Sequence, residues 1–180
     1  MKNYLATLAL TSLVSPVFAD GLNPRTVPSF DLERYMGRWY EVESTQHMRQ
    51  SDCACTTTTY SLNSDESVRL INTCRRGSPD GVLARAEGNA VTSLTNPAAL
   101  SVNLGGFPFF FPNYFVAMID EDYSYAVVSA PLKSALWILS RERTLDSETL
   151  TKIRTELKNR GYDVGKLRPT LQVGCPEEQE

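Results

Sequence analysis

The chain has 180 residues, with 18 lysines and arginines against 21 aspartates and glutamates, which gives a formal net charge of −3. This length predicts one domain, and an apolar content of 42% is enough for a packed core, which argues against wholesale disorder. The slightly acidic balance argues against a nucleic-acid-binding protein, because such proteins carry a basic surface.

The first 19 residues have the pattern of a cleaved secretory signal peptide. Lys2 gives a positive start, residues 5–14 are mostly apolar, and Val17 and Ala19 place small side chains at the −3 and −1 positions before Asp20. We therefore predict a signal peptide at residues 1–19 and a single domain at residues 20–180; an uncleaved anchor is the alternative. No cysteine follows the predicted cleavage point, so we expect a soluble exported protein, periplasmic in a bacterium and otherwise secreted.

Residues 30–36 are expected to form a short helical turn, and eight short segments with alternating apolar residues follow at hairpin spacing. Such a pattern predicts an antiparallel sheet with one buried face. Trp39 and Trp137 in the first and last segments, with Arg141 beside the second, indicate that the sheet closes into an up-and-down barrel whose floor is an indole under a guanidinium. The predicted strands of this all-β fold are residues 39–43, 56–62, 67–73, 82–91, 98–104, 114–119, 123–129 and 135–140.

The first predicted strand contains a conflict between position and charge. If Trp39 faces inward, strict alternation also turns Glu41 and Glu43 inward, which is costly unless each carboxylate finds a partner. A twist or a bulge would instead turn Glu43 outward. The sequence leaves both arrangements open.

The hydrophobic period changes after the last strand. Asp146 is a candidate helix N-cap, and Leu150, Ile153 and Leu157 form one apolar stripe. These features predict one C-terminal α-helix packed on the outside of the barrel.

An even number of cysteines in an exported chain predicts two disulfides among Cys53, Cys55, Cys74 and Cys175. Zinc is the competing interpretation of Cys53 and Cys55, but their spacing is unusual for zinc and no second ligand pair follows, so we expect no metal. A simple hairpin register about residues 64–65 sets Cys55 opposite Cys74 and leaves Cys53 for Cys175. That register places Cys55 on the outer face of the sheet unless a bulge intervenes.

Three motifs occur in an order that is typical of one family. They resemble the three lipocalin signatures, and a helix is again expected after the last strand. The resemblance covers residues 28–176 and is to the branch that holds bacterial outer-membrane lipocalins and apolipoprotein D, while the cysteine pattern is similar to that of plant plastid lipocalins. The motifs are Gly37-Arg38-Trp39-Tyr40-Glu41, the turn from Asp120 to Tyr123, and Trp137-Ile138-Leu139-Ser140-Arg141.

The resemblance implies a protein that binds and carries or stores small lipophilic molecules, such as fatty acids, sterols or pigments. A role in envelope lipid maintenance or in a stress response is expected from the same resemblance. It implies that Arg141 covers the floor indole of Trp39, and it slightly favours the disulfide pairs Cys55–Cys175 and Cys53–Cys74.

An eight-stranded barrel encloses room for side chains or for one small ligand. The small Ala126 and Ala135 are expected to leave space between larger inward-facing side chains, which argues against the alternative of a filled core. Alternation from Trp39 gives the predicted ligand-binding residues Thr58, Tyr60, Leu70, Ala126, Val128, Ala135, Trp137 and Leu139.

The connection after the fifth strand is unusually aromatic. Phe107, Phe109, Phe110 and Phe111 lie within five residues, in a loop that an up-and-down barrel places at its mouth. We expect these rings to form an apolar gate, with Phe109 and Phe111 contacting ligand, and to touch a membrane transiently during loading. Rings that fold inward and plug the mouth are the alternative.

An apolar ligand needs few polar contacts in such a site. Burying about fifteen methylenes at roughly 0.8 kcal/mol each exceeds the cost of association, so micromolar affinity is reachable without a specific polar contact. His47, Arg85 and Lys133 are candidate partners for a ligand carboxylate at the mouth, but a solvated surface role is favoured for each of them individually.

Catalysis is the alternative function, because some barrels of this kind act on lipids or carotenoids. The chain has one histidine and an even number of cysteines, and no Ser/His/Asp or Cys/His set is evident. We therefore expect a binding protein rather than an enzyme, with no cofactor, acting as a monomer or weak dimer.

Overall fold

The protein is described here from a computed structural model, in which residues 23–45, 52–105 and 110–177 are placed well enough for description. The predicted signal peptide at residues 1–19 lies outside these ranges. No helix among the described residues is long and apolar enough to cross a membrane.

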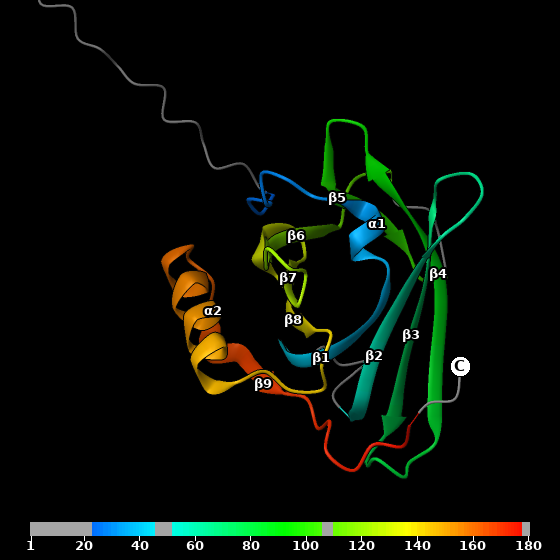
Figure 1. Ribbon diagram of the computed structural model, residues 1–180, viewed down its shortest axis with the longest axis vertical. Helices are drawn as coiled ribbons and strands as arrows, with labels where there is room; N and C mark the ends of the chain where they lie inside the picture. Colours follow the sequence, from blue (N-terminus) through cyan, green and yellow to red (C-terminus); the bar gives the residue numbers. More distant parts are fainter. Residues whose placement is uncertain (1–22, 46–51, 106–109, 178–180) are drawn as a thin grey trace, which may run out of the picture.

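Eight antiparallel strands form a closed barrel (Figure 1), which confirms the predicted fold. Each strand from β2 to β7 pairs with the strand that follows it in sequence. β1 pairs with both β8 and β2, which closes the sheet. The strands are β1 (Gly37–Thr45), β2 (Cys53–Leu62), β3 (Val68–Arg76), β4 (Leu83–Ser93), β5 (Asn96–Asn103), β6 (Tyr114–Ile119), β7 (Tyr125–Ser129) and β8 (Leu136–Ser140).

A ninth strand, β9 (Leu167–Pro169), was not predicted from the sequence. It pairs with Glu43–Thr45 of β1, on the edge that β2 leaves free because β2 pairs only with Gly37–Tyr40. Three residues that include a proline carry too little alternation to be recognised as a strand.

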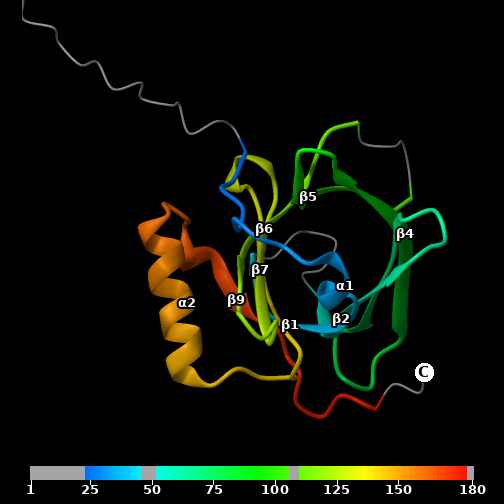
Figure 2. The same ribbon diagram turned by 45° about the horizontal axis from the view of Figure 1, so that its top comes forward.

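Helix α2 (Ser147–Asn159) lies on the outside of the barrel, as predicted (Figures 1 and 2). Asp146 caps its first turn by accepting a hydrogen bond from the Thr149 N–H at 2.8 Å. Ile153 and Leu157 are fully buried in a second apolar cluster, which also contains Val127 of β7. The helix therefore covers outward-facing side chains of the barrel and leaves the interior free.

A register shift in β1 separates the two acidic residues of this strand. The pairing of β1 with β8 shifts between Glu41 and Glu43, so that Glu43 turns outward to α2. There its carboxylate accepts hydrogen bonds from the Nε and Nη2 of Arg154 at 3.0 and 2.6 Å. Glu41 keeps the inward orientation. The bulge thus resolves the conflict that alternation creates in this strand.

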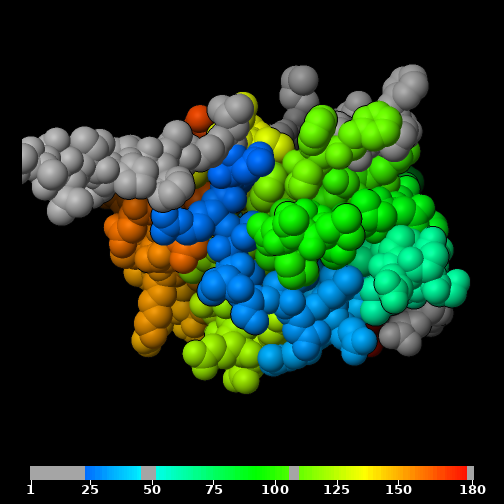
Figure 3. Space-filling view, turned by 90° about the horizontal axis from the view of Figure 1, so that it is seen from above, coloured from blue at the N-terminus to red at the C-terminus, as the bar shows by residue number. Residues whose placement is uncertain are grey.

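The floor of the barrel is closed by a stack that the motifs predict. Trp39 is fully buried, and the guanidinium carbon of Arg141 lies 3.7 Å from the centre of its ring. The same guanidinium donates hydrogen bonds to the backbone oxygens of Arg34, Met36 and Arg38, each at 2.8 Å. Helix α1 (Leu32–Tyr35) crosses this end of the barrel, and Figure 3 shows it from above with the preceding residues.

The disulfides join Cys53 to Cys74 and Cys55 to Cys175. These are the pairs that the family resemblance favours, whereas the simple hairpin register is wrong. Thr57 faces Thr73 across β2 and β3, and a bulge before Thr57 displaces Cys55 from the ladder. Because the bonds close loops with sequence separations of 120 and 21 residues, the chain-entropy account gives about 5 and about 3 kcal/mol.

Candidate functional site

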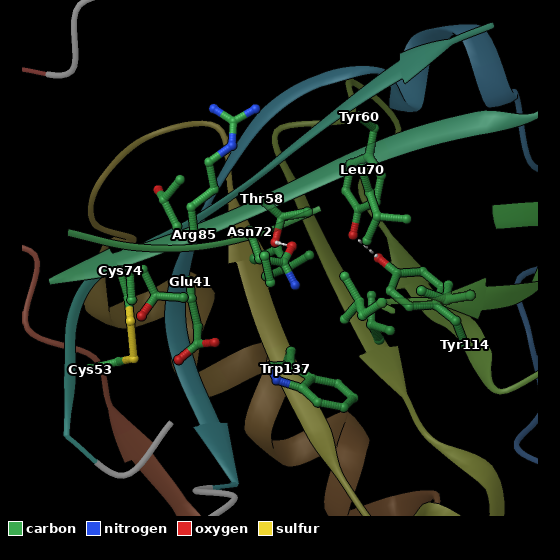
Figure 4. Close-up of a pocket in the computed structure, with 18 of the residues that line it drawn as sticks. Glu41, Cys53, Thr58, Tyr60, Leu70, Asn72, Cys74, Arg85, Tyr114 and Trp137 are labelled. Atoms are coloured by element: carbon green, nitrogen blue, oxygen red, sulfur yellow. Dashed lines mark hydrogen bonds between the residues drawn. A yellow bond between two sulfur atoms is a disulfide. The ribbon is translucent and has the colours of Figure 1, made fainter. Parts of the chain in front are cut away.

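A cavity of about 500 Å³ occupies the barrel interior, so the interior is not a filled core. All eight barrel strands contribute to its wall. Figure 4 shows Thr58 and Asn72 between the end that holds Glu41 and the end that holds Tyr60 and Tyr114. A volume of this size falls within the range of small-molecule sites.

The structure places six of the eight predicted barrel residues on the cavity wall. Ala126 and Ala135 are buried but do not line it. Ala126 packs in the core cluster around Trp39, and Ala135 lies before β8 in a turn closed by the Ala130 N–H. The wall residues among those predicted are Thr58, Tyr60, Leu70, Val128, Trp137 and Leu139.

The predicted aromatic gate is described only in part. Phe107 and Phe109 lie outside the described residues, whereas Phe110 and Phe111 are 87% and 80% exposed. Phe111 is not among the residues that line the cavity, and its contact with a ligand at the mouth stays a prediction. Neither Phe110 nor Phe111 folds inward as a plug.

Three tyrosine hydroxyls meet at the inner end of the cavity. The hydroxyl of Tyr114 lies 2.6 Å from that of Tyr35 and 2.8 Å from that of Tyr60. Burial raises the pKa of Tyr60 to about 12 and holds the pKa values of Tyr35 and Tyr114 well above 10.0, so all three hydroxyls stay protonated at physiological pH. Two hydrogen bonds use two of the three protons, and the third has acceptors within the same group, because the Tyr60 hydroxyl also interacts with the hydroxyls of Tyr35 and Thr58.

A polar pair lies beside this tyrosine cluster (Figure 4). The Thr58 hydroxyl donates to Oδ1 of Asn72 at 2.8 Å. The amide nitrogen of Asn72 has no hydrogen-bond partner among the described residues, and Asn72 lines the cavity. The inner end therefore offers donor groups to a molecule that enters the barrel.

The outer end of the cavity contains an acid and a disulfide. The Glu41 carboxylate is 6% exposed and accepts hydrogen bonds from the hydroxyls of Ser44 at 2.9 Å and Thr170 at 2.6 Å. The Cys53–Cys74 bond lies beside it in the wall (Figure 4).

The predicted basic partners for a carboxylate do not present their charges to the cavity interior. Arg85 is one of the residues that line the cavity, but its guanidinium points away from the interior (Figure 4) and pairs with Glu87 at 3.1 Å. Lys133 donates to the backbone oxygen of Arg160 at 2.6 Å. His47 lies outside the described residues.

Several wall residues were missed from the sequence. Ala84 and Ala86 form an inward-facing row on β4, which alternation with Arg85 and Glu87 could have revealed. Val102 and Leu104 reach the cavity because the end of β5 packs over Gly88, where a Cβ atom would lie 2.0 Å from the Asn103 backbone oxygen. No local pattern predicts that approach.

The described residues contain no group of three or more His, Cys, Asp or Glu that could hold a metal ion. The four cysteines are all in disulfides. The site is a mainly apolar cavity with hydrogen-bonding groups at its inner end, in a barrel that two disulfides cross-link.

Comparison with known proteins identifies the family of this chain. A model of the lipocalin-like domain matches residues 30–172, which is most of the sequence. The chain belongs to the lipocalin family. This lipocalin is 35% identical to the outer membrane lipoprotein Blc of Escherichia coli strain K12 over 150 residues, covering 82% of each chain. It is 34% identical to apolipoprotein D of Cavia porcellus over 163 residues, covering 86% of this chain and 84% of the relative.

Solved structures show the same fold. Lobster apocrustacyanin A1 superposes with a TM-score of 0.63 at 22% identity, covering 80% of this chain and 81% of that one. At this identity the likeness concerns the fold alone.

Proposed function

We propose that this lipocalin binds one small lipophilic molecule in the barrel cavity and carries or stores it. The observation that carries the proposal is the 500 Å³ cavity, closed at the floor by Trp39 and Arg141 and lined by Leu70, Val128 and Leu139. An apolar chain in this space gains about 0.8 kcal/mol for each buried methylene, which is enough for micromolar affinity.

The ligand we expect has an apolar body and an oxygen near its buried end. An acceptor oxygen would receive hydrogen bonds from the two N–H donors of the Asn72 amide, which lines the cavity. A bare hydrocarbon there would leave these donors unpaired at a cost of about 1–3 kcal/mol. A ring ketone, an alcohol or an ester therefore fits this end better than the methyl end of a fatty acid.

We propose that loading takes place at a membrane surface. Exposed apolar side chains on the mouth loops support this idea, because such patches mark interaction sites. They are Val82, Leu83, Leu104, Phe110, Phe111 and Leu132.

We also propose that the protein is exported, as its relative Blc, an outer membrane lipoprotein, suggests, and that it acts in envelope lipid maintenance or a stress response. A binding role is favoured over catalysis by a nucleophilic thiol, because every cysteine is held in a disulfide.

Displacement of a fluorescent fatty acid by other lipids tests the proposal. Ala86→Phe fills the cavity and should weaken binding at least about tenfold, because the ligand and the ring compete for the same space. Glu87→Phe adds the same ring on the outer face of β4, at an exposed position that does not line the cavity, and should bind as the wild type does. Equal affinity of the two variants would contradict binding in the barrel.

The inner polar groups have their own test. Asn72→Leu should weaken binding of a long-chain ketone while leaving binding of an alkane of equal length unchanged or stronger. Equal changes for both ligands would contradict the proposed orientation.

A further inference from the structure

A small hollow on the outer face of the barrel is surrounded by three arginines. Arg38 of β1, Arg75 of β3 and Arg143 after β8 line it together with Tyr40 and Thr57. Its volume is about 10 Å³, which is room for one oxygen atom or one water molecule. Cys55 and Pro176 complete its lining, so it is formed entirely outside the cavity.

These three guanidinium groups have no counter-ion among the residues that the structure describes. None of the residues that line the hollow is acidic, and none of the three arginines forms an ion pair within the described part of the chain. The Nε atoms of Arg38 and Arg75 are buried and have no hydrogen-bond partner there. Bringing three like charges together in a partly desolvated place is unfavourable unless an anion joins them.

Neighbouring contacts hold two of the arginines in position. Arg143 lies 5.1 Å from the ring centre of Tyr40 and donates to the backbone oxygen of Pro176 at 3.1 Å. Arg75 donates to the Gly81 backbone oxygen at 3.3 Å. The contacts use single donors, and a guanidinium has five, so most of the donors remain for a ligand.

We propose that this hollow binds an oxyanion of the phosphate class. One oxygen occupies the hollow between the guanidiniums of Arg38 and Arg75, and the remaining oxygens face Arg143 and solvent. Planar guanidiniums suit such an anion because they donate paired hydrogen bonds to two oxygens at once. Free phosphate and the phosphate of a lipid headgroup share this chemistry.

The acidic end of the chain is the competing occupant. The sequence continues from Pro176 with Glu177, Glu178, Gln179 and Glu180. Glu177, the described acid next to the hollow, is exposed and forms no ion pair with a described residue. Glu177 therefore does not neutralise the three arginines, and occupancy by the acids that follow it is an outcome of the test.

Titration with inorganic phosphate at constant ionic strength, followed by calorimetry, tests the site. We expect a dissociation constant on the order of 1 mM and about a tenfold loss in each of R38Q, R75Q and R143Q, equivalent to about 1.4 kcal/mol. Lys158→Gln removes an exposed cation of α2 and should leave phosphate binding unchanged. Thermal unfolding without phosphate shows that each variant is folded, and R75K, which keeps the charge, should retain more affinity than R75Q.

A vesicle-binding experiment identifies the source of the anion. If vesicles of phosphatidylglycerol bind the wild type more tightly than R38Q, the site accepts a headgroup; if both bind equally while phosphate discriminates them, it accepts free phosphate. Both results support the proposal.

Two results would overturn it. One is a phosphate effect no larger than that of chloride. The other is phosphate binding that appears only after removal of residues 178–180, which would assign the hollow to the chain's own carboxylates.

Discussion

The two ends of the barrel differ in how their side chains are satisfied. At the floor, Trp39 is fully buried, Arg141 donates to three backbone oxygens, and the tyrosine hydroxyls bond to one another. At the mouth, Phe110 and Phe111 lie exposed to solvent. This difference indicates that the floor contributes mainly to the stability of the fold. The mouth can change without loss of the fold and is suited to ligand entry.

The largest effect is expected at the floor. Trp39→Ala should lower the free energy of unfolding by about 3–5 kcal/mol, because it removes a fully buried indole and leaves a void. Urea denaturation measures this change. Leu104→Ala at the mouth should cost less than about 1 kcal/mol, because this side chain is already partly exposed; equal losses would remove the distinction between the two ends.

The tyrosine cluster predicts a loss of stability in alkali. Burial raises the pKa of Tyr60 from 10.0 to about 12, so the folded state holds this proton more tightly than the unfolded state does. Its contribution is therefore complete below pH 10 and is lost as the pH rises from 10 to 12, by about 2–3 kcal/mol. Denaturant unfolding across this range measures the loss, which Tyr60→Phe should reduce. Phenolate absorbance of Tyr60 in the folded protein near pH 10 would contradict the prediction.

A smaller effect is expected for the guanidinium over the floor. Arg141→Lys keeps the charge but loses the planar stack and at least one backbone hydrogen bond, which should cost about 1–2 kcal/mol in unfolding free energy. Arg69→Lys, in an exposed ion pair with Glu87, is the matched control and should change stability by less than about 0.5 kcal/mol. If both replacements have the same effect, the floor stack does not stabilise the barrel.

The smallest effect on stability is expected at the mouth rim. Replacing Phe110 and Phe111 together by Ser should change unfolding free energy by less than about 0.5 kcal/mol, because both rings are exposed. Uptake of a fluorescent lipid from vesicles should become slower. A large drop in melting temperature with unchanged uptake would mean that these rings support the fold.

Local patterns in the sequence predict the barrel well. Alternation at hairpin spacing, the two tryptophans with Arg141, and the Asp146 cap each reflect an interaction within one element or between neighbouring strands. The same alternation holds enough information to turn Arg85 outward, because Ala84, Ala86 and Gly88 form a small inward-facing row. The exposed ion pair of Arg85 with Glu87 agrees with the solvated surface role that the sequence favours for this residue.

The remaining features depend on contacts between distant segments. β9 forms because β2 leaves one edge of β1 free, and Glu43 turns outward because Arg154 of α2 lies 111 residues away in sequence to receive it. Ala126 faces inward as predicted but lies beneath the cavity, since alternation gives a face and not a depth. These positions depend on packing between distant segments, which no short stretch of the sequence reveals.

Native mass spectrometry of the purified protein with an added lipid tests most directly whether the barrel cavity binds a ligand. We predict one ligand per chain for the wild type and for Glu87→Phe, and none for Ala86→Phe under the same conditions. Equal lipid occupancy in all three proteins would contradict binding inside the barrel.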